Sequence, residues 1–394
     1  MNVVCTVPGS KSVTQRALVL AALADGPSEL RGALDCDDSR RLREALRALG
    51  ARIEDADPAA WRVTPGPLRV STAPLECGNA GTALRFLAAL ALLIDDPLTL
   101  DGDEHLRRRP LGDLADALAT LGVAATWRGR PGCPPVTLRR TGQPGDAVTV
   151  ESERSSQFAS ALLLVAPRLP AGLSIRLSGP VVSRPYLALT VECLRGFGVA
   201  VEDAAAGTEL RVAPGGPRGT SSFVEGDWSS AAFLLAAARI AGRALRLANL
   251  RDDSAQGDRA IVELLAGLDR PAPRTFDLRD CPDLLPPLAA AAAFAPGVTT
   301  ISGVAHARVK ESDRLAVLAE GFRRAGVRVG ELPDGLRLEP GDDPGPATLE
   351  PHDDHRMAMA FGLLGLRRPG LRVSNPGCVG KSFPGFWDEL ERLR

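Results

Sequence analysis

The hydrophobic and polar positions of the chain repeat a helix that ends in glycine and continues into a short strand. Each glycine stands where a helix C′ residue would be, and the residues after it alternate as in a half-buried strand. The four clear copies lie at residues 46–53, 118–123, 194–201 and 322–329. A weaker copy lies at residues 264–268, and residues 386–393 form a sixth helical pattern.

The spacing of these copies predicts the fold. Copies that recur roughly every 60 to 75 residues indicate about six units of mixed α and β structure, which we expect to form two lobes of three. The chain should cross between the lobes twice, and the candidate crossings are residues 7–9 and 214–226. The fifth unit is short, because little room remains between Gly257 and Cys281 for the usual strand pair.

The composition fits two or three ordinary domains. The chain has 394 residues, of which 45% are hydrophobic, and its formal net charge is -1. A nearly neutral chain has no overall attraction for nucleic acid or anionic membranes, so any anion binding must come from local clusters. No apolar run approaches the roughly 20 residues that span a bilayer, and the first residues do not resemble a signal peptide. We therefore expect a cytoplasmic protein.

Residue types that are rare in this chain indicate where a binding or catalytic site could lie. The seven cysteines are scattered, odd in number and without a C-x-x-C pair, which predicts reduced thiols rather than disulfides or a zinc site. Of the 47 basic residues, only Lys11, Lys310 and Lys381 are lysine. A lysine ammonium is a compact point charge and arginine a planar fork, so these lysines point to places where an anion is bound or a proton moved. The only tyrosine, Tyr186, is a further pointer.

The first candidate motif places small and hydroxyl residues with cations at the start of a helix. Residues 8–16 (PGSKSVTQR) precede an apolar helix expected at residues 17–24. Free backbone N–H groups and the helix dipole favour an anion at such a start, and Lys11, Ser12 and Arg16 add donors. The spacing is not that of a Walker A loop.

A second motif of this kind begins at Cys77. Its small residues precede a helix that should run to residue 93, so a ligand could approach the backbone closely at Gly81. We expect Arg85 in this motif to be structural. Of the three arginines that follow before the next helix, we assign only Arg109 to a site.

Two hydroxyl-rich motifs follow in the first half of the chain. One begins the helix expected at residues 158–165, and the other surrounds the only tyrosine. Their hydroxyl and amide groups suit a phosphate or a sugar-like polyol. The candidate residues are Ser155, Ser156, Gln157, Ser183 and Tyr186.

The second half adds acid and base groups. Asp283 precedes an alanine-rich helix, and residues 308–314 (RVKESDR) hold five charges before the helix 315–322. The candidates in this charged run are Lys310, Glu311 and Arg314.

Two more motifs open the last helices. Residues 352–357 (HDDHRM) open one helix and contribute Arg356. No third ligand at the spacing of a zinc protease follows these His and Asp residues, so we expect no metal. Residues 380–384 should open the final helix and contribute Lys381.

Together these motifs repeat one arrangement at least five times: small or hydroxyl residues and a cation at the start of a helix. Several helix starts of this kind would suit a ligand with several negative charges. In their order, they resemble the motifs of the EPSP synthase family of enolpyruvyl transferases. The resemblance covers nearly the whole chain. Its motifs lie at residues 8–12, 78–85, 109–114, 155–157, 224–227, 308–314, 354–359 and 381–384.

The resemblance implies an α/β (α+β) fold, a two-lobed inside-out α/β barrel of six βαβαββ repeats. Residues 1–9 and 226–394 would form the lobe on the phosphoenolpyruvate side, and residues 10–225 the lobe on the shikimate 3-phosphate side. The implied reaction moves the enolpyruvyl group of phosphoenolpyruvate to the 5-hydroxyl of shikimate 3-phosphate and releases phosphate, in the shikimate pathway to chorismate. It needs no metal or organic cofactor. We expect a monomer without nucleic-acid or membrane partners.

The resemblance also assigns site residues. Those expected to bind shikimate 3-phosphate are Lys11, Ser12, Arg16, Ser155, Ser156, Gln157, Ser183, Tyr186, Asp283, His306 and Lys310. Those expected to bind phosphoenolpyruvate are Lys11, Gly81, Arg109, Gln157, Arg314, Arg356 and Lys381. Asp283 would take the proton of the 5-hydroxyl, and Glu311 with Lys11 would exchange a proton at the methylene carbon.

Three positions depart from the family pattern. His306 stands where many relatives have asparagine, Phe86 where proline is common, and Arg184 where lysine is frequent. The contact of His306 with the sugar phosphate is the assignment that these departures affect most.

Three alternatives remain at this stage. A UDP-N-acetylglucosamine enolpyruvyl transferase would need a reactive cysteine on a loop, for which Cys133 is the candidate, although the residues 155–157 and 310–311 oppose it. A non-catalytic anion-binding paralogue is opposed by the intact Asp283 and Glu311. A nucleic-acid end-processing enzyme is disfavoured by the neutral charge and by the aromatic content of 4%.

Overall fold

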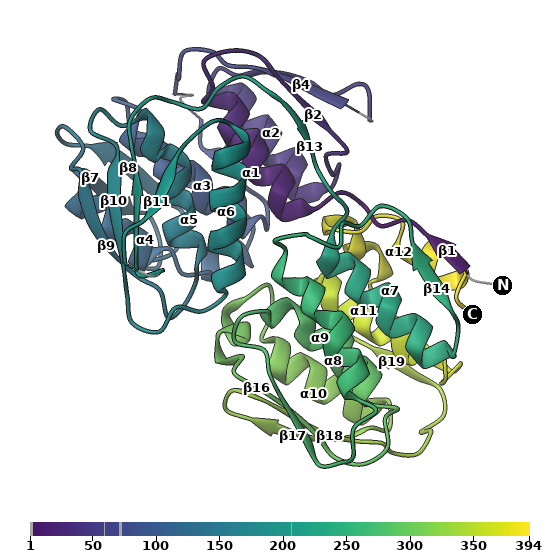
Figure 1. Ribbon diagram of the computed structural model, residues 1–394. Coiled ribbons are helices and arrows are strands. Elements are labelled where there is room, and N and C mark those ends of the chain that lie inside the picture. Colours follow the sequence, from purple (N-terminus) through teal and green to yellow (C-terminus); the bar gives the residue numbers. More distant parts are fainter. Residues whose placement is uncertain (1–2, 59, 71–72, 206) are drawn as a thin grey trace. The chain divides into compact units, whose positions relative to one another are not determined.

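The computed structural model describes residues 3–58, 60–70, 73–205 and 207–394 (Figure 1). It divides into two compact units, which are described separately. The central unit is Gly9–Glu225, and the terminal unit joins Met1–Pro8 to Gly226–Arg394. The chain therefore passes between the units twice. The sequence placed these boundaries after residues 9 and 225.

The described residues of the central unit form three four-stranded sheets with the same internal order. In each sheet the first two strands are parallel, and the second is followed by an antiparallel hairpin. The first sheet is β13 (Ser221–Phe223), β2 (Ser28–Arg31), β4 (Ala60–Thr64) and β3 (Arg52–Glu54). The second is β5 (Leu75–Glu76), β6 (Leu98–Asp101), β8 (Val136–Arg140) and β7 (Val123–Trp127). The third is β9 (Ala147–Glu151), β10 (Leu173–Ser178), β12 (Glu209–Val212) and β11 (Val201–Asp203).

Three helices of the central unit are buried on almost every side. They are α1 (Lys11–Ala22), α3 (Gly81–Ala89) and α5 (Gln157–Val165). They pack against one another, as expected of helices that are apolar all round, so they lie inside the unit (Figure 1). The other three helices have one buried and one exposed face. They are α2 (Asp37–Ala48), α4 (Gly112–Thr120) and α6 (Arg184–Gly196).

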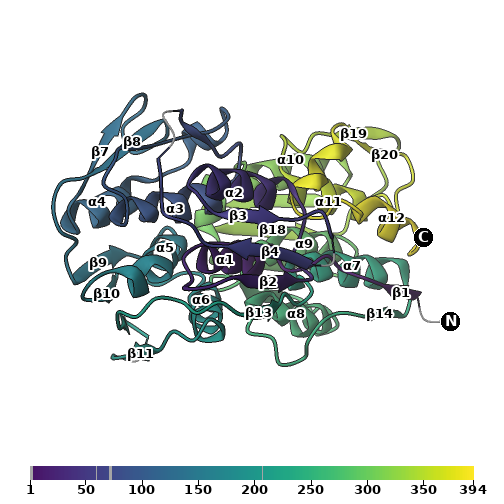
Figure 2. The same ribbon diagram turned by 90° about the horizontal axis from the view of Figure 1, so that it is seen from above.

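The described residues of the terminal unit form one four-stranded sheet of the same order and two parallel strand pairs. Figure 2 shows both pairs on the side of the unit where the two chain ends lie. The four-stranded sheet is β15 (Arg274–Asp277), β16 (Thr299–Ser302), β18 (Gly335–Glu339) and β17 (Arg328–Leu332). The pairs are β1 (Val3–Cys5) with β14 (Leu245–Leu247), and β19 (Ala347–Leu349) with β20 (Leu371–Val373).

Three interior helices again form the core of the terminal unit. They are α7 (Trp228–Ala241), α9 (Leu285–Ala292) and α11 (His355–Leu364), and they pack together. The remaining helices are α8 (Ile261–Gly267), α10 (Arg314–Arg324) and α12 (Phe386–Glu391).

The helix-ending glycines test the pattern on which the fold prediction depended. Gly50, Gly122, Gly198 and Gly326 all have a positive φ, between 77° and 109°, which confirms their C′ positions. The weaker copy is wrong, because Gly267 ends α8 without a positive φ. A β-carbon there would lie 2.7 Å from the Phe276 ring, so close packing accounts for this glycine instead.

The structure also tests the expected short unit, the start of the first helix and the state of the cysteines. The shortened unit is confirmed, because no strand lies between α8 and β15, where every residue is described. The first helix begins at Lys11, not at residue 17, because the polar residues of the motif form its first turns. All seven cysteines are free thiols. In the part of the chain that the structure describes, no helix is long and apolar enough to cross a membrane.

Candidate active site

Several of the predicted site residues lie at or just before the amino-terminal ends of interior helices. Lys11, Gly81 and Gln157 are the first residues of α1, α3 and α5. In the terminal unit, Arg356 lies in the first turn of α11, and Asp283 lies in the short helix η5 (Pro282–Leu284) directly before α9. Helix starts carry unpaired backbone N–H groups and the positive end of the dipole, so each unit presents an anion-attracting end.

Gly81 and Arg109 share one small space in the central unit. Arg109 is buried. A β-carbon added to Gly81 would lie 2.5 Å from Arg109 Cζ and 2.6 Å from its Nη1. The guanidinium therefore lies directly against the start of α3, in the space that a side chain at position 81 would occupy.

Arg85 connects three of the predicted motifs. Its Nη1 donates to Gln157 Oε1 at 2.6 Å and its Nη2 to the carbonyl oxygen of Pro110 at 3.0 Å. Gln157 in turn donates through Nε2 to Thr82 Oγ1 at 3.1 Å. The guanidinium also lies 5.3 Å from the centre of the Phe158 ring. Arg85 is structural, as the sequence predicted, and it fixes the orientation of the Gln157 amide.

Arg16 is buried and its hydrogen-bond partners are neutral. Its Nε donates to Thr190 Oγ1 at 2.8 Å, and its two terminal nitrogens donate to the carbonyl oxygens of Ser12 at 2.9 Å and Tyr186 at 3.2 Å. The ring of Phe86 lies 5.4 Å away, which gives this unusual residue a cation–π role. Burial lowers the pKa of Arg16. A buried cation with neutral partners is poorly compensated, so a nearby anion would stabilise it.

Lys11 and the hydroxyl motifs are the other candidate residues of the central unit. Lys11 Nζ lies 3.0 Å from Asp38 Oδ2, an ion pair that the sequence did not indicate. Ser155 Oγ accepts a hydrogen bond from the Gln157 backbone at 3.2 Å, and Ser156 is buried beside it. Ser183 has a φ of 56°, an uncommon backbone for a residue with a side chain. Such strain is often found at functional sites.

In the terminal unit, Arg314 lies at the centre of a cluster of carboxylates. Its Nη1 is 2.8 Å from Asp283 Oδ1, its Nη2 is 2.7 Å from Glu311 Oε2, and its Nε is 2.8 Å from Asp354 Oδ2. Arg314 is only 2% exposed. The sequence did not assign a role to Asp354, although an Asp directly before a helix is a recognisable cap.

Asp283 lies between two arginines. Arg356 Nη2 is 3.2 Å from its Oδ2, opposite the contact with Arg314. Burial alone would raise the pKa of Asp283, but the charges of Arg356, Lys310 and Arg314 outweigh it and hold the pKa well below its usual range. Asp283 is therefore ionised at any ordinary pH.

His306 and Lys381 are two further predicted residues of the terminal unit. Burial, and then the charge of Lys310, lower the pKa of His306 to about 4, so its imidazole is neutral at physiological pH. Lys381 is buried at the end of the short helix η7 (Pro376–Lys381), which packs on α11. The expectation that Lys381 opens the last helix is wrong, because Pro384 disfavours helical backbone just before it and α12 begins at Phe386.

Comparisons with known proteins identify the family. A family model described as EPSP synthase (3-phosphoshikimate 1-carboxyvinyltransferase) matches residues 2–390. The chain belongs to the EPSP synthase family. Curated relatives named 3-phosphoshikimate 1-carboxyvinyltransferase include those of Rhizobium leguminosarum and Methanothermobacter thermautotrophicus. Each is 40% identical, over 98% of this chain and 93% or 94% of the relative.

Two solved structures are similar to this chain. The EPSP synthase of Acinetobacter baumannii has a TM-score of 0.79 and 27% identity, over 100% of this chain and 95% of that one. The enolpyruvyl transferase NikO of Streptomyces tendae has a TM-score of 0.75 over 100% and 94% of the two chains. Its identity is 19%, so this second likeness concerns the fold alone.

Proposed function

We propose that the chain transfers the enolpyruvyl group of phosphoenolpyruvate to the 5-hydroxyl of shikimate 3-phosphate and releases phosphate. The observation that carries this proposal is the position of Asp283, an ionised carboxylate held between Arg314 and Arg356 in a member of the EPSP synthase family. Such an arrangement combines a proton acceptor with two guanidinium groups that suit carboxylate and phosphate groups.

The fold proposed with it is a two-lobed inside-out α/β barrel of six βαβαββ repeats. Three sheets and three pairs of helices in each unit support this description. The interior helices and outer sheets within each unit support the term inside-out. Among the described residues of the terminal unit, two repeats would then lack their antiparallel hairpin.

Residues of each unit are assigned to the two substrates. We assign phosphoenolpyruvate to Lys11, Gly81, Arg109, Gln157, Arg314, Arg356 and Lys381. We assign shikimate 3-phosphate to Lys11, Ser12, Arg16, Ser155, Ser156, Gln157, Ser183, Tyr186, Asp283, His306 and Lys310. The poorly compensated charge of Arg16 supports an anion in its vicinity, and a neutral His306 can donate or accept one hydrogen bond to a hydroxyl.

Asp283 would take the proton of the 5-hydroxyl. A carboxylate whose pKa is far below its usual range is a weak base. An anionic substrate that binds Arg314 and Arg356 would share their charge and so raise the pKa of Asp283 toward a useful value. Substrate binding would thus activate the base.

Glu311 would exchange the second proton at the methylene carbon, and Lys11 is assigned to the same proton exchange. Glu311 is held by Arg314 at 2.7 Å, so base and acid are fixed by the same guanidinium. The hydroxyl oxygen bonds to the substituted carbon of phosphoenolpyruvate while the methylene gains a proton. Loss of phosphate and of one methyl proton then restores the double bond.

The alternative acceptor, UDP-N-acetylglucosamine, finds no support in Cys133. This thiol is buried, and burial raises its pKa. A reactive cysteine needs the opposite shift, because only the thiolate is nucleophilic.

The proposal is tested by mixing the purified protein with shikimate 3-phosphate and phosphoenolpyruvate and following phosphate release. We expect steady release that requires both substrates. Absence of release beside an active control enzyme would refute the proposal, and release with UDP-N-acetylglucosamine instead would support the alternative. Light scattering in the same buffer would test the expected monomer.

Gly81→Ala should raise the KM for phosphoenolpyruvate by roughly tenfold and leave the affinity for shikimate 3-phosphate nearly unchanged. The added methyl group would force the end of the Arg109 side chain to move away from the start of α3. Glyphosate, which we expect to compete for the same pocket, should lose affinity in parallel. Gly26→Ala is the matched control, because nothing lies within 4 Å of a β-carbon there. Equal loss of affinity for both substrates would contradict the placement of Gly81.

A further inference from the structure

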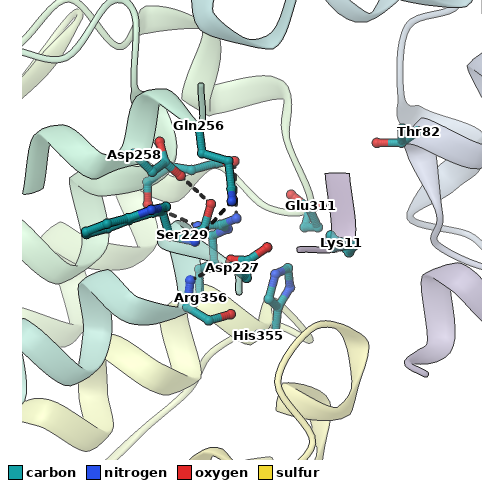
Figure 3. Close-up of polar contacts among 12 residues, drawn as sticks. Lys11, Thr82, Asp227, Ser229, Gln256, Asp258, Glu311, His355 and Arg356 are labelled. Carbon is teal, nitrogen blue, oxygen red and sulfur yellow. Dashed lines mark hydrogen bonds and ion pairs between the residues drawn. The ribbon is translucent and has the colours of Figure 1, made fainter. Parts of the chain in front are cut away.

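Asp258 is a buried carboxyl group that the proposed reaction does not use. It lies in the short helix η4 (Gly257–Ala260) of the terminal unit and is 3% exposed. Its Oδ2 accepts a hydrogen bond from Ser229 Oγ (Figure 3). Its Oδ1 is buried and has no hydrogen-bond partner among the residues that the structure describes.

The chain around Asp258 is fixed by hydrogen bonds to the start of α7. Gln256 Oε1 accepts from the backbone of Trp228 at 3.1 Å, and Gln256 Nε2 donates to the carbonyl oxygen of Gly226 at 2.9 Å. The Asp227 side chain caps the same helix by accepting from the backbone of Ser230 at 2.7 Å. The carboxyl group therefore has little freedom to turn away.

Several charged or titratable groups face Asp258 from neighbouring elements. They are Asp227 before α7, Asp283 in η5, Arg356 on α11 and Cys281 before η5. Burial, and then the negative charge of Asp283, raise the pKa of Asp258 to about 7, against the lowering effect of Arg356. The carboxyl groups of Asp258 and Asp283 thus both interact with the positive charge of Arg356. Only Asp283 is ionised throughout the neutral pH range.

We propose that Asp258 is a positioning residue for Arg356. When Asp258 is protonated, Arg356 stays paired with Asp283 and available to an anionic substrate. When Asp258 is ionised, it attracts Arg356 away from Asp283 and repels the substrate. This inference rests on the proposed function, in which Arg356 binds phosphoenolpyruvate.

The expected signature is a dependence of the KM for phosphoenolpyruvate on pH. Asp258 is protonated below pH 7 and loses its proton above it, so the KM should rise by about three- to tenfold between pH 6 and pH 8. Phosphoenolpyruvate titrates as well, but its titration is common to all variants and cancels in a comparison between them.

Asp258→Asn keeps the shape of the side chain and cannot ionise. We expect its KM at pH 6 to equal that of the wild type and the rise that depends on Asp258 to be absent. Ser229→Ala should move this rise to higher pH, because the hydroxyl donor that lowers the pKa of Asp258 is lost. Asp269→Asn is the matched control, since Asp269 is exposed and paired with Arg239.

Thermal unfolding at different pH values gives a second measurement that does not need turnover. The folded state holds the Asp258 proton more tightly than the unfolded state, whose pKa is about 3.9. The protonated Asp258 side chain therefore contributes to the stability of the folded protein at low pH. This contribution is lost as the pH rises from about 4 to about 7. The Asn variant should lack this loss.

The outcomes separate this inference from the proposed function. A KM profile of Asp258→Asn parallel to that of the wild type, or an unchanged profile in Ser229→Ala, would overturn the role of Asp258. If the wild type failed to release phosphate, the proposed function would fall, while the melting curves would still report whether Asp258 titrates near pH 7.

Discussion

Asp283→Asn is expected to reduce kcat by about 10²- to 10⁴-fold, the usual contribution of a general base. Asparagine has the shape of the carboxylate but cannot take the proton of the 5-hydroxyl. It also removes the negative charge between Arg314 and Arg356, so the affinity for phosphoenolpyruvate should increase or stay unchanged. The measurement is kcat at saturating concentrations of both substrates, with the affinity for each determined by calorimetry.

The control for this variant is Asp280→Asn, three residues earlier in the chain. Asp280 is exposed, so the same chemical change there should leave kcat close to the wild-type value. An Asp283→Asn enzyme that keeps more than a third of the wild-type kcat would show that another group accepts the proton.

Arg314→Leu is expected to lower the free energy of unfolding by about 3–5 kcal/mol at pH 7. The substitution leaves Asp283, Glu311 and Asp354 buried together without the cation that they share. The deficit should shrink as the pH falls through the carboxyl range, because protonation removes the uncompensated charges from the variant. Urea unfolding at pH 7 and at pH 4 measures both effects.

Arg324→Leu, at the other end of α10, is the matched control. Its guanidinium is half exposed and 3.9 Å from Glu320, a surface pair that contributes little. We expect a change within about 0.5 kcal/mol. If the two variants lost similar amounts of unfolding free energy, the buried cluster around Arg314 would contribute no more to stability than a surface ion pair.

The sequence predicted the repeated helix-glycine-strand element correctly in its clear copies but not in its weaker copy. The pattern of apolar positions followed by glycine depends on local backbone geometry, which a short stretch of sequence specifies, so Gly50 and Gly326 were predicted correctly. Gly267 has the same local pattern but serves the packing of Phe276, a residue from a different element. Local sequence alone cannot distinguish these two uses of glycine.

The candidate site shows the same limit. Motifs at helix starts predicted Gly81, Gln157 and Arg356, because small residues and cations at such positions have a direct physical reason. Arg85, which holds the Gln157 amide, was predicted as structural, but other supporting residues were not predicted. The ion pair between Lys11 and Asp38 joins residues 27 positions apart in the chain, and the hydrogen bond from Ser229 to Asp258 joins residues 29 positions apart. Neither contact can be read from a short stretch of sequence.

The two crossings of the chain bear on the order in which the protein folds during its synthesis. Residues 9–225 of the central unit are continuous, so the ribosome completes this unit before most of the terminal unit exists. The strand β1 must wait for β14, and Val7 must wait for Asn249, 242 residues later in the chain. The unit that contains Asp283 and Arg314 can therefore form only after the central unit is complete. Until β14 has been synthesised, β1 lacks the strand with which it pairs in the terminal unit.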